Sequence, residues 1–210
     1  MTSVMRIDSL ASKPDRVGRY SVRLDDGKVL RLYRQTIEDY CLFTGKELSD
    51  EQMTQLLQDA GKMSAKMRAV RIVAASSVSK DDLQQRLIRK GEDPDQAAEA
   101  VDWMADLNLI DDAQTARQLA GRCAARGYGI AKAKQVLYEK RIPKSYWEDA
   151  LADYPDQSEH IQAFLRSKLG SGCDERQQKR VIDALLRRGH SYQEIRSAMR
   201  QLEYDDFPED

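Results

Sequence analysis

Residues that build disulfide frameworks, zinc sites and large aromatic cores are scarce in this chain. Its 210 residues include three cysteines, two histidines and only 7% aromatic side chains. Cys41, Cys123 and Cys173 are odd in number, lie far apart and form no Cys-x-x-Cys pair. Only His160 and His190 could join them, so the sequence predicts reduced thiols rather than a disulfide framework or a metal site.

Long apolar runs and nucleotide-binding motifs are also missing. No segment reaches the roughly 18 consecutive apolar residues of a membrane span, and the first residues lack the charged-then-apolar order of a secretory signal. We therefore expect a cytoplasmic protein without a membrane partner. No GxxxxGK[ST] or GxGxxG loop follows a predicted strand, and no nucleophile elbow is present. We expect no catalytic residue, no metal and no cofactor.

Charge is what the chain has in abundance. Charged residues make up 33% of the sequence and hydrophobic residues 41%, yet the net charge is only −1. Rich charge with few aromatic residues favours helices over a β-sandwich. The balanced total does not exclude a nucleic-acid partner, because opposite charges can be segregated on the surface.

The N-terminal segment predicts a small sheet. Apolar and polar residues alternate over residues 4–10 and 20–25, and a second apolar run covers residues 29–33. Asp26-Gly27 between the last two runs is a strong hairpin signal, since Gly accepts the positive φ of a tight turn. We expect three strands, covered on one face by helices because so small a sheet is unstable alone.

Two helices are expected after the sheet. Thr36 is predicted to cap a short helix that Gly45 ends, and Ser49 with Gln52 forms a capping box before a longer apolar pattern that Gly61 interrupts. Residues 1–60 contain nine basic and ten acidic side chains. This balance gives no reason to assign nucleic-acid binding to the N-terminal region.

From residue 62 onward the chain is repetitive. Three copies of a helix, a basic turn and a second helix recur at a spacing of about 50 residues, each preceded by a further helix. Ser79 and Asp93-Pro94 are expected to begin helices of the first copy. We predict three tandem three-helix repeats in an elongated curved array, with the sheet in front. Asp153–Asp156 and Gly170–Gly172 predict a flexible connection to the third repeat.

Residues 109–144 stand out within the second repeat. Asp111-Asp112 could be a carboxylate pair for metal or acid–base chemistry, but no His or third acid lies at ligand spacing, so a helix cap is favoured. Gly127 and Gly129 flank Tyr128 and predict a helix break. Tyr128 is interpreted either as a core residue or as an exposed stacking or interface anchor.

After Asp112 this stretch is almost purely basic. Eight basic residues face the single acid Glu139. Such a run is often a solvated helix face, but exposed helices normally interleave Glu with Lys. A face of one sign is costly in self-repulsion unless a polyanion or an acidic partner uses it. The candidate binding residues are Arg117, Arg122, Arg126, Tyr128, Lys132, Lys134, Lys140 and Arg141, and the structural motif residues are Asp111, Asp112, Gly127 and Gly129.

The combined pattern resembles the RecX family of bacterial recombinase regulators. The matching stretches are Leu83–Gly91, Leu109–Arg117, Arg126–Gly129 and Lys134–Ile142, and the resemblance covers residues 63–203. Arg141 stands where the family commonly has a Gly. The resemblance implies tandem three-helix repeats, binding in the groove of the RecA–DNA filament, and inhibition of strand exchange, ATP hydrolysis or filament growth. It also implies contact with single- and double-stranded DNA.

The sequence therefore predicts a non-enzymatic regulator of RecA in recombination, DNA repair and the SOS response. The expected segments are an N-terminal extension (residues 1–60) and repeats over 61–108, 109–153 and 154–210, the last with an acidic tail. One alternative is a DNA-binding helical scaffold that acts without RecA. The other is a DNA-processing enzyme, which would need a metal cluster or phosphate loop that the sequence does not display.

Overall fold

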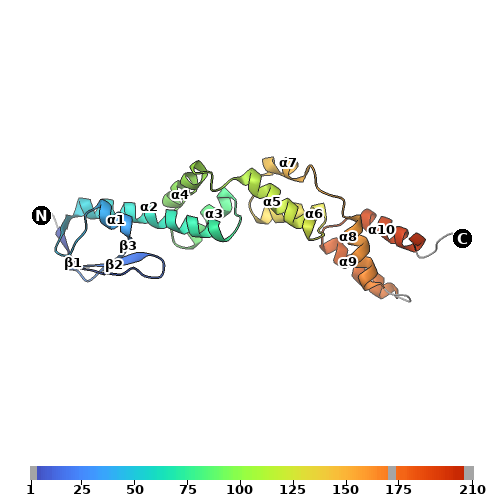
Figure 1. Ribbon diagram of the computed structural model, residues 1–210, viewed down its shortest axis with the longest axis horizontal. Helices are drawn as coiled ribbons and strands as arrows, with labels where there is room; N and C mark the ends of the chain where they lie inside the picture. Colours follow the sequence, from blue (N-terminus) through green and yellow to red (C-terminus); the bar gives the residue numbers. More distant parts are fainter. Residues whose placement is uncertain (1–3, 170–173, 206–210) are drawn as a thin grey trace. The chain divides into compact units, whose positions relative to one another are not determined.

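The computed structural model is mainly helical, with a small antiparallel sheet at the N-terminus (Figure 1). It describes residues 4–169 and 174–205, so Cys173, Gly170–Gly172 and most of the acidic tail lie outside the described residues. The chain forms two compact units, residues 1–109 and 110–210.

The sheet of the first unit has four strands in the order β3-β2-β1-β4. They are β1 (Val4–Leu10), β2 (Arg19–Leu24), β3 (Val29–Tyr33) and β4 (Glu47–Ser49). The predicted hairpin is confirmed: β2 pairs with β3, and Gly27 has a φ of +83° between them. The expected number of three strands was wrong, because β4 pairs antiparallel with β1. Its three residues are too few to display an alternating pattern.

Apolar residues on one face of the sheet pack against two helices. Buried Ile7, Val22 and Leu32 form one cluster with Met53 and Leu56 of α2 (Asp50–Ala75). The short α1 (Arg34–Asp39) also contacts α2. The predicted Thr36 cap was wrong, because Tyr33 occupies the N-cap and Thr36 is buried inside the helix.

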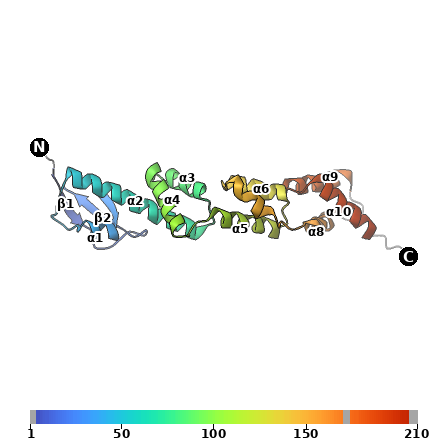
Figure 2. The ribbon, with the colours of Figure 1, turned by 90° about the horizontal axis from the view of Figure 1, so that it is seen from above.

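Helix α2 is one continuous segment of 26 residues (Figure 2). Its start confirms the predicted capping box, in which the Ser49 hydroxyl accepts from the Gln52 N–H and the Gln52 side chain accepts from the Ser49 N–H. The expected interruption at Gly61 is not there. A Cβ at Gly61 would lie 2.4 Å from Oε1 of Gln96, so the side-chain amide of Gln96 packs against α2 at this glycine.

That pair is α3 (Lys80–Arg89) and α4 (Pro94–Asp106), and both pack against α2. Ser79 and Asp93 are their N-caps as predicted, with side chains that accept from backbone N–H groups of the first turn. Pro94 stands at the first turn of α4, where a missing N–H costs nothing. Among residues 4–169 and 174–205, no helix is long and apolar enough to cross a membrane.

The second unit holds two successive helix groups, each around its own apolar cluster. The first contains α5 (Asp112–Ala125), α6 (Ile130–Glu139), the 3₁₀ turn η1 (Lys144–Tyr146) and α7 (Trp147–Leu151). The second contains α8 (Ser158–Lys168), α9 (Glu175–Arg187) and α10 (Tyr192–Asp205). Leu119, Cys123 and Leu137 are buried in the first group, and Ile161, Leu185 and Ile195 in the second.

Candidate nucleic-acid interface

The doubled acid at the start of α5 is structural. The Asp111 carboxylate accepts from the backbone N–H groups of Ala113 at 2.8 Å and Gln114 at 3.1 Å, which confirms the helix cap. A carboxylate there also interacts favourably with the positive end of the helix dipole. Asp112 is buried in the first turn of α5. Within the described part of the chain, no group of three or more His, Cys, Asp or Glu residues could hold a metal ion.

The break between α5 and α6 follows from its glycines. Helix α5 ends at Ala125, Gly127 has a φ of +66°, and the Tyr128 N–H donates back to the Cys123 carbonyl at 3.1 Å. This backbone pattern satisfies carbonyls at a helix end and favours glycine in the left-handed position. Gly129 then becomes the N-cap of α6.

The same turn contacts the turn between α9 and α10. The Gly129 N–H donates to the Arg188 carbonyl at 3.0 Å. A Cβ at Gly129 would lie 2.1 Å from the Gly189 carbonyl oxygen, and one at Gly189 would lie 2.3 Å from the Lys132 nitrogen. Both glycines are therefore required by close backbone approach, a constraint that the prediction of a flexible third repeat did not include.

His190 completes this contact. Its side chain is buried, with only 4% of its surface exposed. Burial lowers the pKa of its imidazole, and the hydrogen bond to Gly127 opposes that shift. The neutral ring donates from Nε2 to the Gly127 carbonyl at 3.0 Å, because a carbonyl can only accept. Nδ1 has no hydrogen-bond partner among the described residues.

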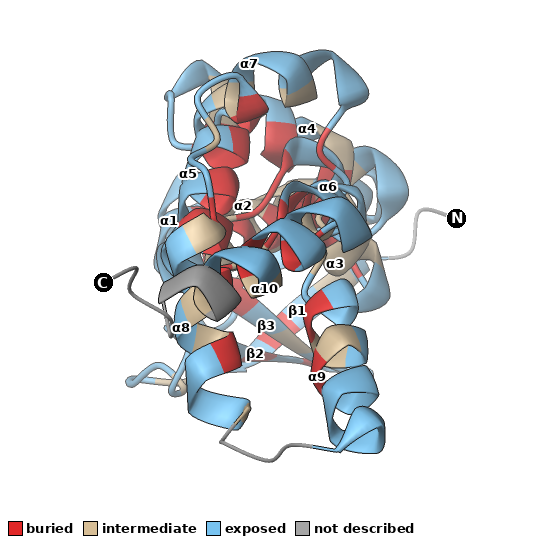
Figure 3. Cartoon of the chain, turned by 90° about the vertical axis from the view of Figure 1, so that its right-hand side faces the viewer, coloured by how far each residue is buried: buried red, intermediate tan, exposed pale blue. Residues whose placement is uncertain are grey.

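The candidate binding residues differ in how far their side chains are exposed. Arg117, Arg122, Arg126, Lys134 and Arg141 are exposed, while Lys132, Lys140 and Tyr128 are half-buried. Helix α5 buries the opposite face, seen as the red segments near its label in Figure 3.

Three of these charges flank the turn between α5 and α6. Arg122 lies in the last turn of α5, Arg126 is its C-cap, and Lys132 follows in the first turn of α6. Burial raises the pKa of Cys123, and the positive charges of Arg126, Arg122 and Lys132 oppose that rise. We call Arg122, Arg126 and Lys132 the basic turn cluster.

Arg117 does not belong to the basic turn cluster. It lines a separate cleft of about 200 Å³ between α5 and the segment around α7, together with the acids Asp149 and Asp153. Two carboxylates thus line the same cleft as Arg117. Linear sequence grouped Arg117 with the others because the acids of α7 lie more than 30 residues further along the chain.

Tyr128 is neither a fully buried core residue nor a fully exposed anchor. Its half-buried ring packs against the apolar cluster of the first helix group, and its carbonyl accepts from the Tyr154 hydroxyl at 2.7 Å. Sequence reasoning overlooked Tyr138 on α6, which is 71% exposed. Ile130, Lys134 and Tyr138 are spaced by four residues and are all exposed, so helical spacing could have identified this mixed face.

Several known proteins that are similar to this chain carry the same name. The chain is 22% identical to the regulatory protein RecX of Clostridioides difficile, over 98% of this chain and 100% of the relative. It is 26% identical to RecX of Halorhodospira halophila, over 71% of this chain and 96% of the relative. RecX of Chromohalobacter salexigens is 29% identical over 62% of this chain and 88% of its own.

Solved structures of the same name share the fold. A crystal structure of regulatory protein RecX matches with a TM-score of 0.60 and 21% identity, over 92% of this chain and 99% of that one. RecX from Lactobacillus salivarius matches with a TM-score of 0.59 and 22% identity, over 68% of this chain and 97% of that one. A scan against protein-family models gives no match.

Proposed function

These comparisons support a RecX family protein, and on that premise we propose that the chain is a non-enzymatic regulator, and specifically an inhibitor, of the RecA recombinase. It would bind in the groove of the RecA–DNA filament and thereby modulate recombination, DNA repair and the SOS response. The observation that carries the proposal is the match to a regulatory protein RecX along nearly the whole chain.

The basic turn cluster supports a role for the second repeat in this binding. Arg122 and Arg126 are exposed, Lys132 is half-buried, and Lys134 is exposed two residues further along α6. Arg and Lys side chains bind DNA phosphates because they neutralise the phosphate charge and release the counterions around it. We propose that this face contacts the DNA or an acidic surface of the filament. Bridging of neighbouring filament subunits would alter their exchange without any covalent step.

A charge-removal variant tests the proposed face. We expect Arg122→Gln/Arg126→Gln/Lys134→Gln to weaken binding to RecA–single-stranded DNA filaments by about tenfold at moderate salt. The slope of log affinity against log salt should fall by about two, because each lost phosphate contact contributes about 0.7. Lys132 is kept, since its side chain is half-buried and donates to the Gln135 side chain at 2.9 Å. Fluorescence anisotropy across a salt series measures both quantities.

The control is Arg6→Gln/Arg23→Gln/Arg89→Gln, which removes the same charge from exposed positions of the first unit. It should bind as the parent does. Equal affinities and equal salt slopes for the two triple variants, with circular dichroism unchanged, would contradict the assignment of this face.

The two alternative functions predict different results in binding and cleavage assays. A DNA-binding scaffold that acts without RecA would bind DNA alone as tightly as the filament, whereas a RecA regulator would prefer the filament. A titration with DNA alone, RecA alone and the filament separates these two. A DNA-processing enzyme would cleave single- or double-stranded DNA in the presence of divalent metal, which a nuclease assay detects.

A further inference from the structure

A second cationic site lies in the first unit, far along the sequence from the basic turn cluster. It is a cleft of about 440 Å³ between the loop before β2, the C-terminal half of α2 and helix α3. This volume is within the range of about 300 to 1,000 Å³ that is usual for ligand clefts. Its lining has five cationic side chains and no carboxylate: Arg19, Arg68, Arg71, Arg86 and Lys90, with Val17, Ile72, Ala75 and Ser76 between them.

Three of these cations form ion pairs with carboxylates that do not line the cleft. Arg19 forms an ion pair with Asp15 at 2.9 Å. Arg68 pairs with the buried Glu92 at 2.7 Å. Arg86 pairs with Asp82 at 2.8 Å. These pairs hold each guanidinium in place. Arg68 also donates to the Lys90 carbonyl at 2.7 Å, and Arg86 to the Ser76 hydroxyl at 3.3 Å.

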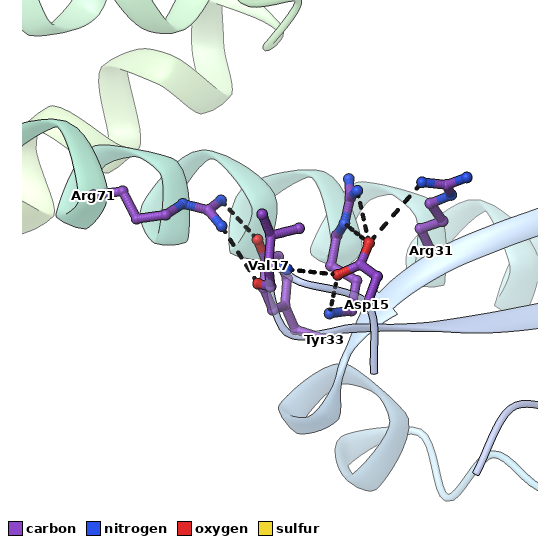
Figure 4. A network of polar contacts seen from close by, with 6 residues as sticks. Asp15, Val17, Arg31, Tyr33 and Arg71 are labelled. Atoms are coloured by element: carbon purple, nitrogen blue, oxygen red, sulfur yellow. Dashed lines mark hydrogen bonds and ion pairs between the residues drawn. The ribbon is translucent and has the colours of Figure 1, made fainter. Parts of the chain in front are cut away.

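Arg71 is held differently. Its guanidinium donates to the Tyr33 hydroxyl at 2.9 Å and to the Val17 carbonyl at 3.4 Å, so only neutral groups position it (Figure 4). Figure 4 shows the side chain reaching from α2 to the loop and strand that carry those acceptors. In residues 4–169 and 174–205, neither Arg71 nor Lys90 forms an ion pair with an acid. The cleft therefore carries uncompensated positive charge at two exposed positions.

We propose that this cleft binds the phosphodiester backbone of DNA. Guanidinium groups offer paired N–H donors that match phosphate oxygens, and a lysine adds a mobile point charge. The apolar side chains of Val17, Ile72 and Ala75 lie between the charges, where they suit the sugar that separates successive phosphates.

An acidic peptide fits the lining less well. A bound peptide needs partners for its backbone N–H and C=O groups as well as for its carboxylates. Ser76 is the lone uncharged polar side chain that lines the cleft. The proposal goes beyond the regulator role, because it concerns DNA alone and requires no RecA.

The test is a double variant of the two uncompensated cations in the full-length protein. Arg71→Gln/Lys90→Gln removes two charges and leaves a neutral polar amide at each position. With a fluorescent 20-nucleotide single-stranded DNA and no RecA, we expect affinity to fall about tenfold and the salt slope to fall by about one to one and a half. The matched control Arg23→Gln/Arg89→Gln loses the same charge from exposed positions outside the cleft and should bind as the parent does.

Three results would overturn the proposal. They are equal DNA affinity of the cleft variant and its control, no DNA binding by the parent protein, and displacement of the DNA by polyglutamate with the same dependence on Arg71 and Lys90. Because RecA is absent from this assay, its failure leaves the filament experiment on Arg122, Arg126 and Lys134 unaffected. Failure of the filament experiment likewise leaves the proposal for this cleft unaffected.

Discussion

At the residue scale, the contact between the two turns of the second unit depends on the absence of side chains. Gly129 and Gly189 face each other so closely that an added Cβ would lie within 2.1 to 2.3 Å of backbone atoms. Backbone cannot rotate away as a flexible side chain can. Among the glycines of residues 110–169 and 174–205, these two should therefore be the least tolerant of substitution.

Gly129→Ala should lower the free energy of unfolding by about 2 kcal/mol or more, as expected for overpacking against fixed backbone. Urea denaturation followed by circular dichroism measures the loss. Gly121→Ala is the matched control: Gly121 lies within α5, and an added Cβ would meet no atom within 4 Å. Because Ala favours a helix over Gly by about 0.5 to 1 kcal/mol, that control should be slightly stabilising. Similar effects of both substitutions would refute the close-contact explanation.

His190 makes this contact sensitive to pH. Burial lowers the pKa of the folded-state imidazole below its usual 6.5, so the unfolded chain takes up a proton before the folded chain does. The stability that depends on the neutral ring is present above pH 6.5 and is lost as pH falls below it. Urea midpoints at pH 7.5, 6.5 and 5.5 should decrease in that order.

His190→Gln should reduce this decrease, because the Gln side-chain amide can donate to the Gly127 carbonyl without titrating. The partner His160 is present in both proteins, so it does not account for a difference between them. If the variant and the parent lose stability equally between pH 7.5 and 5.5, His190 is not the group responsible.

At the scale of elements, helix starts were the most predictable features. Ser49, Ser79, Asp93 and Asp111 each cap the helix expected from local sequence, since a cap needs only one side chain and the adjacent backbone N–H groups. The start of α1 was missed because Tyr33 caps it with no side-chain hydrogen bond. Continuity of α2 through Gly61 was missed because Gln96, which packs there, comes from another helix.

The cap at Asp111 gives an element-scale prediction. Asp111→Asn keeps an oxygen that accepts from the first-turn N–H groups and should cost a few tenths of a kcal/mol, whereas Asp111→Ala should cost about 0.5 to 2 kcal/mol. Thermal denaturation of the two variants measures the difference. A binding or catalytic role for the carboxylate predicts a different outcome, in which Asn impairs function as severely as Ala.

At the scale of the whole molecule, charge was the hardest property to predict. The net charge of −1 and the balanced composition of residues 1–60 concealed the first-unit cleft, because its cations come from residues 19 to 90 while the carboxylates that pair with three of them do not line it. The basic run after Asp112 was visible in sequence, but its division into the basic turn cluster and Arg117, which lines a cleft with two acids, was not. Both require knowledge of which helices lie side by side.

Helix α2 has a mechanical consequence for the first unit. Its 26 residues extend for about 39 Å at the usual rise per residue. Met53 and Leu56 near its start are embedded in the core of the sheet, while Ala65 and Ala69 further along are buried in the part that packs on α3 and α4. The sheet and this helix pair therefore both pack on one continuous helix. A force or a ligand that displaces the sheet must carry α3 and α4 with it, so the first unit transmits motion along its length instead of absorbing it at a hinge.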